Sequence, residues 1–186
     1  MKSKFTTHRL VTVALLAALT AVGSALRITI PVDIAGNTSF HLGNIFCALS
    51  GLLLGPWFGG LASGLGSMIY DMTNPMYISE CWLTFLMKGA LGLVAGLVAW
   101  SGKKENWNYP LALAGSAAGA CVYALLYLVK SFCKTYFIKG VPLDGTWVAV
   151  AAKIPATLFN AVVAIIIAPI LAIAIREGLK RAHIEL

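Results

Sequence analysis

Residues 41–44 read His-Leu-Gly-Asn, residues 51–56 read Gly-Leu-Leu-Leu-Gly-Pro, and residues 84–89 read Thr-Phe-Leu-Met-Lys-Gly. Between the second and third motifs runs a glycine-studded apolar segment that ends in Tyr70 and Asp71. Polar side chains thus lie near the ends of apolar helices, where lipid offers them no hydrogen-bond partner and where they commonly serve a function. This stretch predicts a pocket embedded in a bundle of membrane helices.

The composition excludes an ordinary soluble domain. Of the 186 residues, 59% are hydrophobic and 11% are charged, whereas soluble domains average about 25% charged residues. The mean hydropathy is +0.84. No polar or Pro/Gly/Ser-rich linker is long enough to separate two domains, so residues 1–186 are expected to form a single integral membrane domain.

Six apolar segments predict an all-α membrane protein with a six-transmembrane-helix bundle. They run over residues 10–26, 42–54, 57–70, 81–100, 111–132 and 147–175, the last beginning as an interfacial turn. The second and third segments are short for a hydrocarbon core of about 30 Å. We therefore expect a tight turn at Gly55-Pro56, near the cytoplasmic face.

The charges flank the apolar segments, which argues against nucleic acid as a partner although the formal net charge is +7. Basic residues gather on the side that carries both termini, and the positive-inside rule places that side in the cytoplasm, as in a multi-pass protein of the cell membrane. These residues are Lys2, Lys4, Arg9, Lys103, Lys104, Arg176, Lys180 and Arg181. The other side carries Arg27, Lys130, Lys134 and Lys139, accompanied by Asp33, Asp71, Glu80 and Asp144. If the first helix is instead a cleaved signal peptide, five helices remain and the bias reverses.

Metal and redox chemistry are not indicated. The four cysteines have no CxxC or zinc-type spacing, and most lie in apolar runs, where cysteine behaves as a small hydrophobic residue. We expect no metal and no cofactor.

Polar residues recur at helical spacing in the outer halves of the last four helices and predict one shared cavity. A lysine in the middle of a membrane helix costs about 2.5 to 3.5 kcal/mol, so Lys88 and Lys153 need an explanation. They line a ligand pocket, extend to the interface, or pair with Glu80 or Asp71. The candidate substrate-binding residues are His41, Asn44, Tyr70, Asp71, Tyr77, Glu80, Thr84, Lys88, Tyr127, Trp147, Lys153 and Asn160. Interfacial anchoring remains an alternative for the aromatic residues, and a solvated helix cap for His41.

Residues 27–40 predict a short hairpin over this cavity. They contain the alternating Ile-Thr-Ile-Pro-Val run and a possible turn at Gly36-Asn37. The hairpin forms the outer loop between the first and second helices.

Taken together, the three motifs resemble those of the substrate-binding S components of energy-coupling factor (ECF) vitamin transporters, over about residues 12–96. The similarity is greatest to the hydroxymethylpyrimidine/riboflavin-type branch. It implies a six-helix fold, an outer loop that acts as a lid, and a vitamin or vitamin precursor as ligand. It also implies partners: a membrane-embedded coupling subunit and two ATPases. One departure is Asn44, where relatives often carry an acid.

Ala14 and Ala18 match the Ala-x-x-x-Ala pattern with which S components contact the coupling subunit. Small residues at this spacing let another helix approach closely in lipid. Packing inside the bundle is the alternative.

The chain has no G-x-x-x-x-G-K-[ST] phosphate-binding loop, so partners are expected to supply ATP hydrolysis. An intramembrane enzyme that uses Asp71, Glu80, His41 or Lys88 is an alternative, but no H-E-x-x-H or G-x-S-x-G motif accompanies them. A stand-alone transporter is the third possibility, and no evident inverted repeat favours it. The substrate is expected to be hydroxymethylpyrimidine or vitamin B6, with riboflavin the next candidate.

Overall fold

The computed structural model describes residues 7–32, 36–101 and 108–182. Their α-helices are α1 (Thr7–Ala25), α2 (Gly43–Leu54), α3 (Pro56–Thr73), α4 (Cys81–Ala99), α5 (Tyr109–Cys133), α6 (Leu143–Ala151) and α7 (Ile154–Arg181). A 3₁₀ turn, η1 (Ile78–Glu80), precedes α4, and a π-helical turn, η3 (Lys134–Ile138), follows α5. The predicted charges at Lys2, Lys4, Asp33, Lys103 and Lys104 lie outside the described residues.

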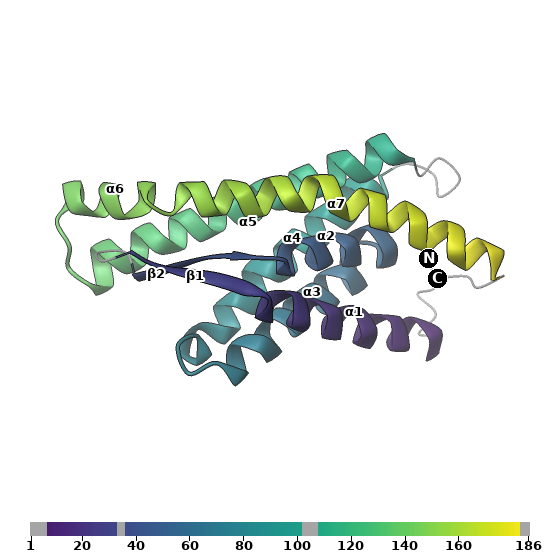
Figure 1. The fold of residues 1–186 in the computed structure, drawn as a ribbon, viewed down its shortest axis with the longest axis horizontal. Coiled ribbons are helices and arrows are strands. Elements are labelled where there is room, and N and C mark those ends of the chain that lie inside the picture. The colour runs from purple at the N-terminus through teal and green to yellow at the C-terminus, as the bar shows by residue number, and fades with distance from the viewer. Residues whose placement is uncertain (1–6, 33–35, 102–107, 183–186) are drawn as a thin grey trace.

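The helices form an elongated bundle in which α1 begins and α7 ends at the same end (Figure 1). The hairpin strands extend from α1 toward the opposite end, and the second strand contacts α7. Within the described residues, three helical stretches are long and apolar enough to cross a membrane: Ile78–Ala99, Tyr109–Ile138 and Leu143–Arg181. Arg9–Ala25 and Gly43–Leu54 are shorter apolar helices.

The turn between α2 and α3 confirms the predicted tight joint. Gly55 adopts φ 77°, a left-handed conformation that side chains rarely tolerate, and Pro56 follows at the start of α3. Proline suits this position because the first N–H groups of a helix have no intrahelical partner. The joint folds α3 back along α2.

Glycines allow several helices to pack closely against one another. A Cβ on Gly64 would lie 2.8 Å from the Phe85 side chain and backbone, so α3 and α4 approach at backbone distance. A Cβ on Gly119 would lie 2.6 Å from the Leu91 carbonyl oxygen, which joins α5 to α4 in the same way. Close backbone approach of this kind replaces the hydrophobic drive that lipid does not supply.

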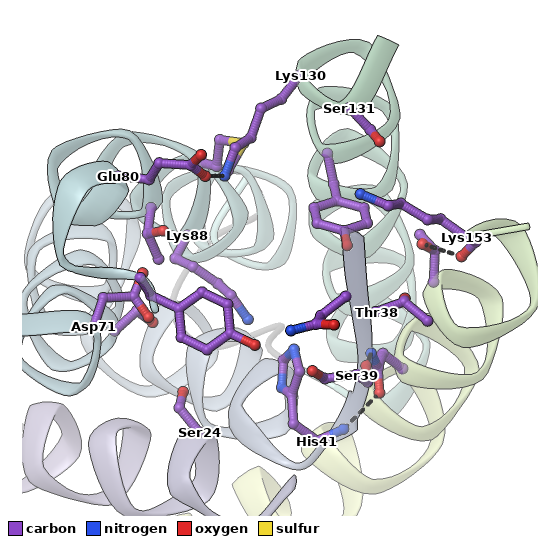
Figure 2. A pocket seen from close by; sticks show the side chains of 18 of the residues that line it. Ser24, Thr38, Ser39, His41, Asp71, Glu80, Lys88, Lys130, Ser131 and Lys153 are labelled. Atoms are coloured by element: carbon purple, nitrogen blue, oxygen red, sulfur yellow. Dashed lines mark hydrogen bonds and ion pairs between the residues drawn. The ribbon is translucent and has the colours of Figure 1, made fainter. Parts of the chain in front are cut away.

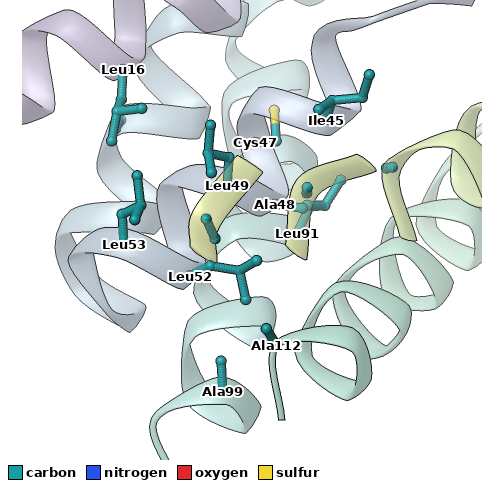
Figure 3. Close-up of a cluster of buried hydrophobic side chains, with 14 of the residues drawn as sticks. Leu16, Ile45, Cys47, Ala48, Leu49, Leu52, Leu53, Leu91, Ala99 and Ala112 are labelled. Atoms are coloured by element: carbon teal, nitrogen blue, oxygen red, sulfur yellow. The ribbon is translucent and has the colours of Figure 1, made fainter. Parts of the chain in front are cut away.

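The apolar core surrounds α2, which is the most enclosed helix. Leu49, Leu52 and Leu91 are at most 1% exposed and form part of a cluster contributed by α1, α2, α3, α4, α5 and α7 (Figure 3). The hydrophobic core is therefore packed around α2.

The predicted sixth helix is wrong in one respect, because it is two helices in line. The helical pattern breaks at Ala152 and Lys153. Pro155 explains the break: in a continuous helix its ring would clash with the carbonyl of Ala151, the last residue of α6.

The hairpin segment contains an antiparallel pair, β1 (Arg27–Val32) and β2 (Gly36–His41). Arg27 pairs with His41, and Pro31 pairs with Asn37. Gly36 and Asn37 therefore lie in β2, and the prediction of a turn there is wrong. A turn at 36–37 would pair Arg27 with a residue of α2, whereas β2 must end before α2 begins at Gly43.

Candidate functional site

A cavity of about 320 Å³ lies beneath the hairpin, between α3, α4, α5 and α7 (Figure 2). Its size is that of a small-molecule site. The lining includes nine of the twelve predicted residues: His41, Asp71, Tyr77, Glu80, Thr84, Lys88, Tyr127, Lys153 and Asn160. The structure thus brings together residues from the hairpin and from helices that are distant in sequence.

Asn44, Tyr70 and Trp147 are not among the lining residues. Asn44 and Tyr70 instead contact basic residues that are. Trp147 is 58% exposed on α6, where its ring packs 5.1 Å from that of Phe132. It lies outside the cavity because α6 continues beyond the end of the hairpin.

Lys88 is 4% exposed, which rules out extension to the interface. Its Nζ donates a hydrogen bond to Asn44 Oδ1 and lies 4.5 Å from the centre of the Tyr123 ring. No carboxylate of the described residues lies within ion-pair distance of this ammonium. An amide oxygen and a ring face therefore take the place of a counter-charge.

Lys153 has similar surroundings on the opposite wall. It is 7% exposed and lies in the break between α6 and α7. Its Nζ is 5.6 Å from the centre of the Tyr127 ring, and no ion pair involves it within the described part of the chain. The helix break, rather than a mid-helix position, places this lysine.

Arg27 begins β1 and lines the cavity near its mouth. Its Nε donates to the Ser24 carbonyl oxygen at 2.8 Å. Its guanidinium carbon lies 4.2 Å from the centre of the Tyr70 ring and 4.9 Å from that of Tyr77. From the sequence, Arg27 is predicted only to contribute to the charge of the outer side. The available signal was its position at the first residue of the predicted hairpin.

The rim contains an ion-pair cluster around Glu80. Its carboxylate lies 2.5 Å from Lys130 Nζ and also pairs with Lys134. Glu80 is therefore occupied by two lysines and is unavailable to Lys88 or Lys153.

Asn160 joins the hairpin to α7. Its Oδ1 accepts the backbone N–H of His41 at 3.0 Å, and its Nδ2 donates to the Ser39 carbonyl oxygen at 2.8 Å. One amide side chain thus continues the hydrogen-bonding edge of β2. Asn160 lines the cavity, but its polar atoms hold the hairpin.

With this geometry established, the comparison with known families is informative. The family model of the ECF-type riboflavin transporter S component matches residues 4–177. The chain belongs to the ECF transporter S components. It is also similar to a Pyrococcus woesei protein described as "Uncharacterized protein in gap 3'region", with 33% identity over 115 residues, which are 62% of this chain and 72% of that protein.

Membership sets the enzyme alternative aside, since the ECF S components are membrane-embedded transport proteins. The ionisable residues of the cavity are therefore not assigned catalytic roles.

Several polar atoms on the cavity wall of this S component have no protein partner. The buried hydroxyls of Ser24 and Ser131 and the Nδ1 atom of His41 make no hydrogen bond with any described residue. Burial lowers the pKa of His41 well below its usual range, and the positive charges of Lys88 and Arg27 act in the same direction. His41 is therefore neutral at pH 7. Sequence spacing could not reveal Ser24 or Ser131, because isolated serines are common in membrane helices.

Proposed function

We propose that this S component is the substrate-binding membrane subunit of an ECF-type importer and that its ligand, a vitamin or vitamin precursor, binds beneath the hairpin. The observation that carries the proposal is the cavity itself, whose wall contains unpartnered polar atoms. Buried polar groups are normally hydrogen-bonded, so such atoms are suited to a ligand. Tyr77, Tyr123 and Tyr127 offer aromatic surface to a flat ring.

The predicted residues divide into two groups under this proposal. Those placed to contact ligand are His41, Asp71, Tyr77, Thr84, Lys88, Tyr127 and Lys153. Asn44, Tyr70, Glu80 and Asn160 act through other residues, because each is engaged with a basic side chain or with the hairpin backbone. Trp147 is left out.

Transport would depend on partners. Ala14 and Ala18 are exposed on α1, whereas Ala17 and Thr20 are buried where α1 packs on Gly66 of α3. This outward position supports docking of a membrane-embedded coupling subunit rather than packing inside the bundle. Two ATPases attached to that subunit would supply the energy.

The proposed orientation has six spans in the cell membrane and both termini in the cytoplasm. Arg9 near the start of α1 and Lys180 and Arg181 at the end of α7 lie at the end of the bundle away from the hairpin. Their shared position supports this topology under the positive-inside rule. The hairpin then faces outward, where substrate is captured.

Ligand binding by the isolated chain tests the function. We expect one vitamin-like molecule to be retained by the protein purified in detergent and identified by mass spectrometry, and to rebind one-to-one in titration. Ser131→Leu, which puts a larger side chain on the cavity wall, should abolish rebinding, whereas Ser101→Leu at an exposed site should not. Equal binding by both variants would remove this cavity as the ligand site.

A further inference from the structure

The cavity has a surplus of positive charge. Six basic side chains and two carboxylates line it. The basic residues are Arg27, Lys88, Lys130, Lys134, Lys139 and Lys153, and the acids are Asp71 and Glu80. Because His41 is neutral, the residues that line the cavity have a formal net charge of four positive charges. A ligand that enters this space meets a strongly positive wall.

Two of the six cations, Lys88 and Lys153, are buried. Glu80 is shared by Lys130 and Lys134, which leaves Asp71 as the one carboxylate among the described lining residues without a lysine at ion-pair distance. Asp71 is hydrogen-bonded to Thr84. Of the other basic lining residues, Arg27, Lys88 and Lys153 make no ion pair with any described residue.

Aromatic rings compensate these cations only in part. The attraction of a cation to a ring face is weaker than the cost of removing an ammonium group from water. Lys88 and Lys153 are 4% and 7% exposed, so water hydrates them little. A buried cation requires a partner, and an anion in the cavity would provide one.

The two buried lysines contact the two rings of one tyrosine pair. Lys88 lies over Tyr123 and Lys153 over Tyr127, and these two rings of α5 stack with centres 6.1 Å apart. Figure 2 shows the lysines entering the cavity from opposite sides, Lys88 from the α4 side and Lys153 from the α6–α7 junction. Each ring of this pair thus has one lysine ammonium group near it.

We propose that the ligand of this site carries an anionic group, a carboxylate or a phosphate ester, held by Lys88 and Lys153 beside the Tyr123–Tyr127 pair. The inference rests on the proposed function and narrows its substrate class. Charge-assisted hydrogen bonds from lysine to carboxylate or phosphate oxygens are about twice as strong as neutral ones. The unpartnered Ser131 hydroxyl, on the same helix as the tyrosines, is a further donor.

Matched neutral and anionic probes test the inference. Riboflavin is compared with riboflavin 5′-phosphate, and pyridoxine with 4-pyridoxate, by equilibrium dialysis of the full chain in detergent. The anionic member carries a phosphate in the first pair and a carboxylate in the second. The pair with the larger difference in affinity therefore shows which of the two anions the site prefers. We expect the anionic member of at least one pair to bind roughly ten- to a hundredfold more tightly.

Substitutions assign that preference to the two lysines. Lys88→Met and Lys153→Met should each reduce the preference for the anionic probe by roughly tenfold or more. Lys153→Arg should retain this preference. Lys180→Met, an exposed change at the end of α7, should leave it unaltered. Thermal unfolding provides a readout that needs no ligand. Removing an unpaired buried charge should raise the melting temperature of unloaded Lys153→Met, which also shows that this variant folds.

Two results would overturn the inference while leaving vitamin binding intact. The first is equal affinity for the neutral and the anionic member in both pairs. The other is an anion preference that survives in both methionine variants. Failure of the proposed function is different, because wild-type protein would then retain no molecule and bind neither member of either pair.

Discussion

At the scale of single residues, Asn160 decides how the hairpin meets the bundle. Its amide supplies one acceptor and one donor to the β2 backbone, and an aspartate or a hydrophobic residue could not do both. The residue lies on α7, so the C-terminal helix fixes the strand that precedes α2.

Replacing Asn160 should loosen the hairpin. We expect Asn160→Ala to lower the free energy of unfolding by about 1 to 3 kcal/mol, because the His41 N–H and the Ser39 carbonyl lose their partner. Hydrogen exchange should locate the effect at the amide of His41. Leu158→Ala on the same helix, where the side chain is 55% exposed, is the matched control. An unchanged exchange rate at His41 would mean that other contacts hold β2.

At the scale of elements, glycine seams decide which helices approach closely. Gly119 shows the constraint, because the nearest atom to an added Cβ is a backbone oxygen of α4 that cannot rotate away. Gly178 of α7 is the contrasting case, since nothing lies within 4 Å of an added Cβ there.

The two glycines should therefore respond with opposite sign to the same change. Gly119→Ala should destabilise the protein by about 1 to 3 kcal/mol, as overpacking does. Gly178→Ala should stabilise it by about 0.4 to 1 kcal/mol, because alanine lowers the entropy of the unfolded chain. Melting temperatures in one detergent measure both. A rise for Gly119→Ala would show that α4 and α5 separate at no cost.

The sequence predicted local features better than contacts between elements. The Gly55-Pro56 joint followed from backbone chemistry alone, and helical spacing found Thr84 and Lys88 on one face of α4. The position of Arg27 between two tyrosines, and the bond from Asn160 to β2, depend on how distant segments pack. No spacing rule contains that information.

The break before α7 lies between these cases. Pro155 is a sequence signal for this break, although apolar residues continue on both sides of it. The structure places Lys153 in the break between α6 and α7, from which its side chain reaches the cavity.

At the scale of the whole molecule, the proposed ligand site and the proposed docking surface are separate. The cavity lies under the hairpin, whereas Ala14 and Ala18 are on the exposed face of α1. A change on that face should disturb assembly without reaching the ligand.

Ala18→Trp should therefore abolish ATP-dependent uptake in liposomes that contain the coupling subunit and ATPases, because the bulky ring blocks close helix approach. The ligand affinity of the isolated chain should stay within about twofold of the wild-type value. Ala174→Trp, also exposed but on α7, is the control and should affect neither. Loss of affinity and folding together would indicate that Ala18 packs internally, and unimpaired uptake would exclude docking at this position.

The hairpin has a consequence for how such proteins diversify. Its residues Arg27, Thr38 and His41 form part of the cavity wall, yet the glycine contacts that join the helices lie elsewhere. Under the proposed function, mutations in the hairpin would change ligand choice with little effect on the bundle. A lineage can acquire a new nutrient by altering one short ribbon while the helices, and any partner that recognises them, are inherited unchanged.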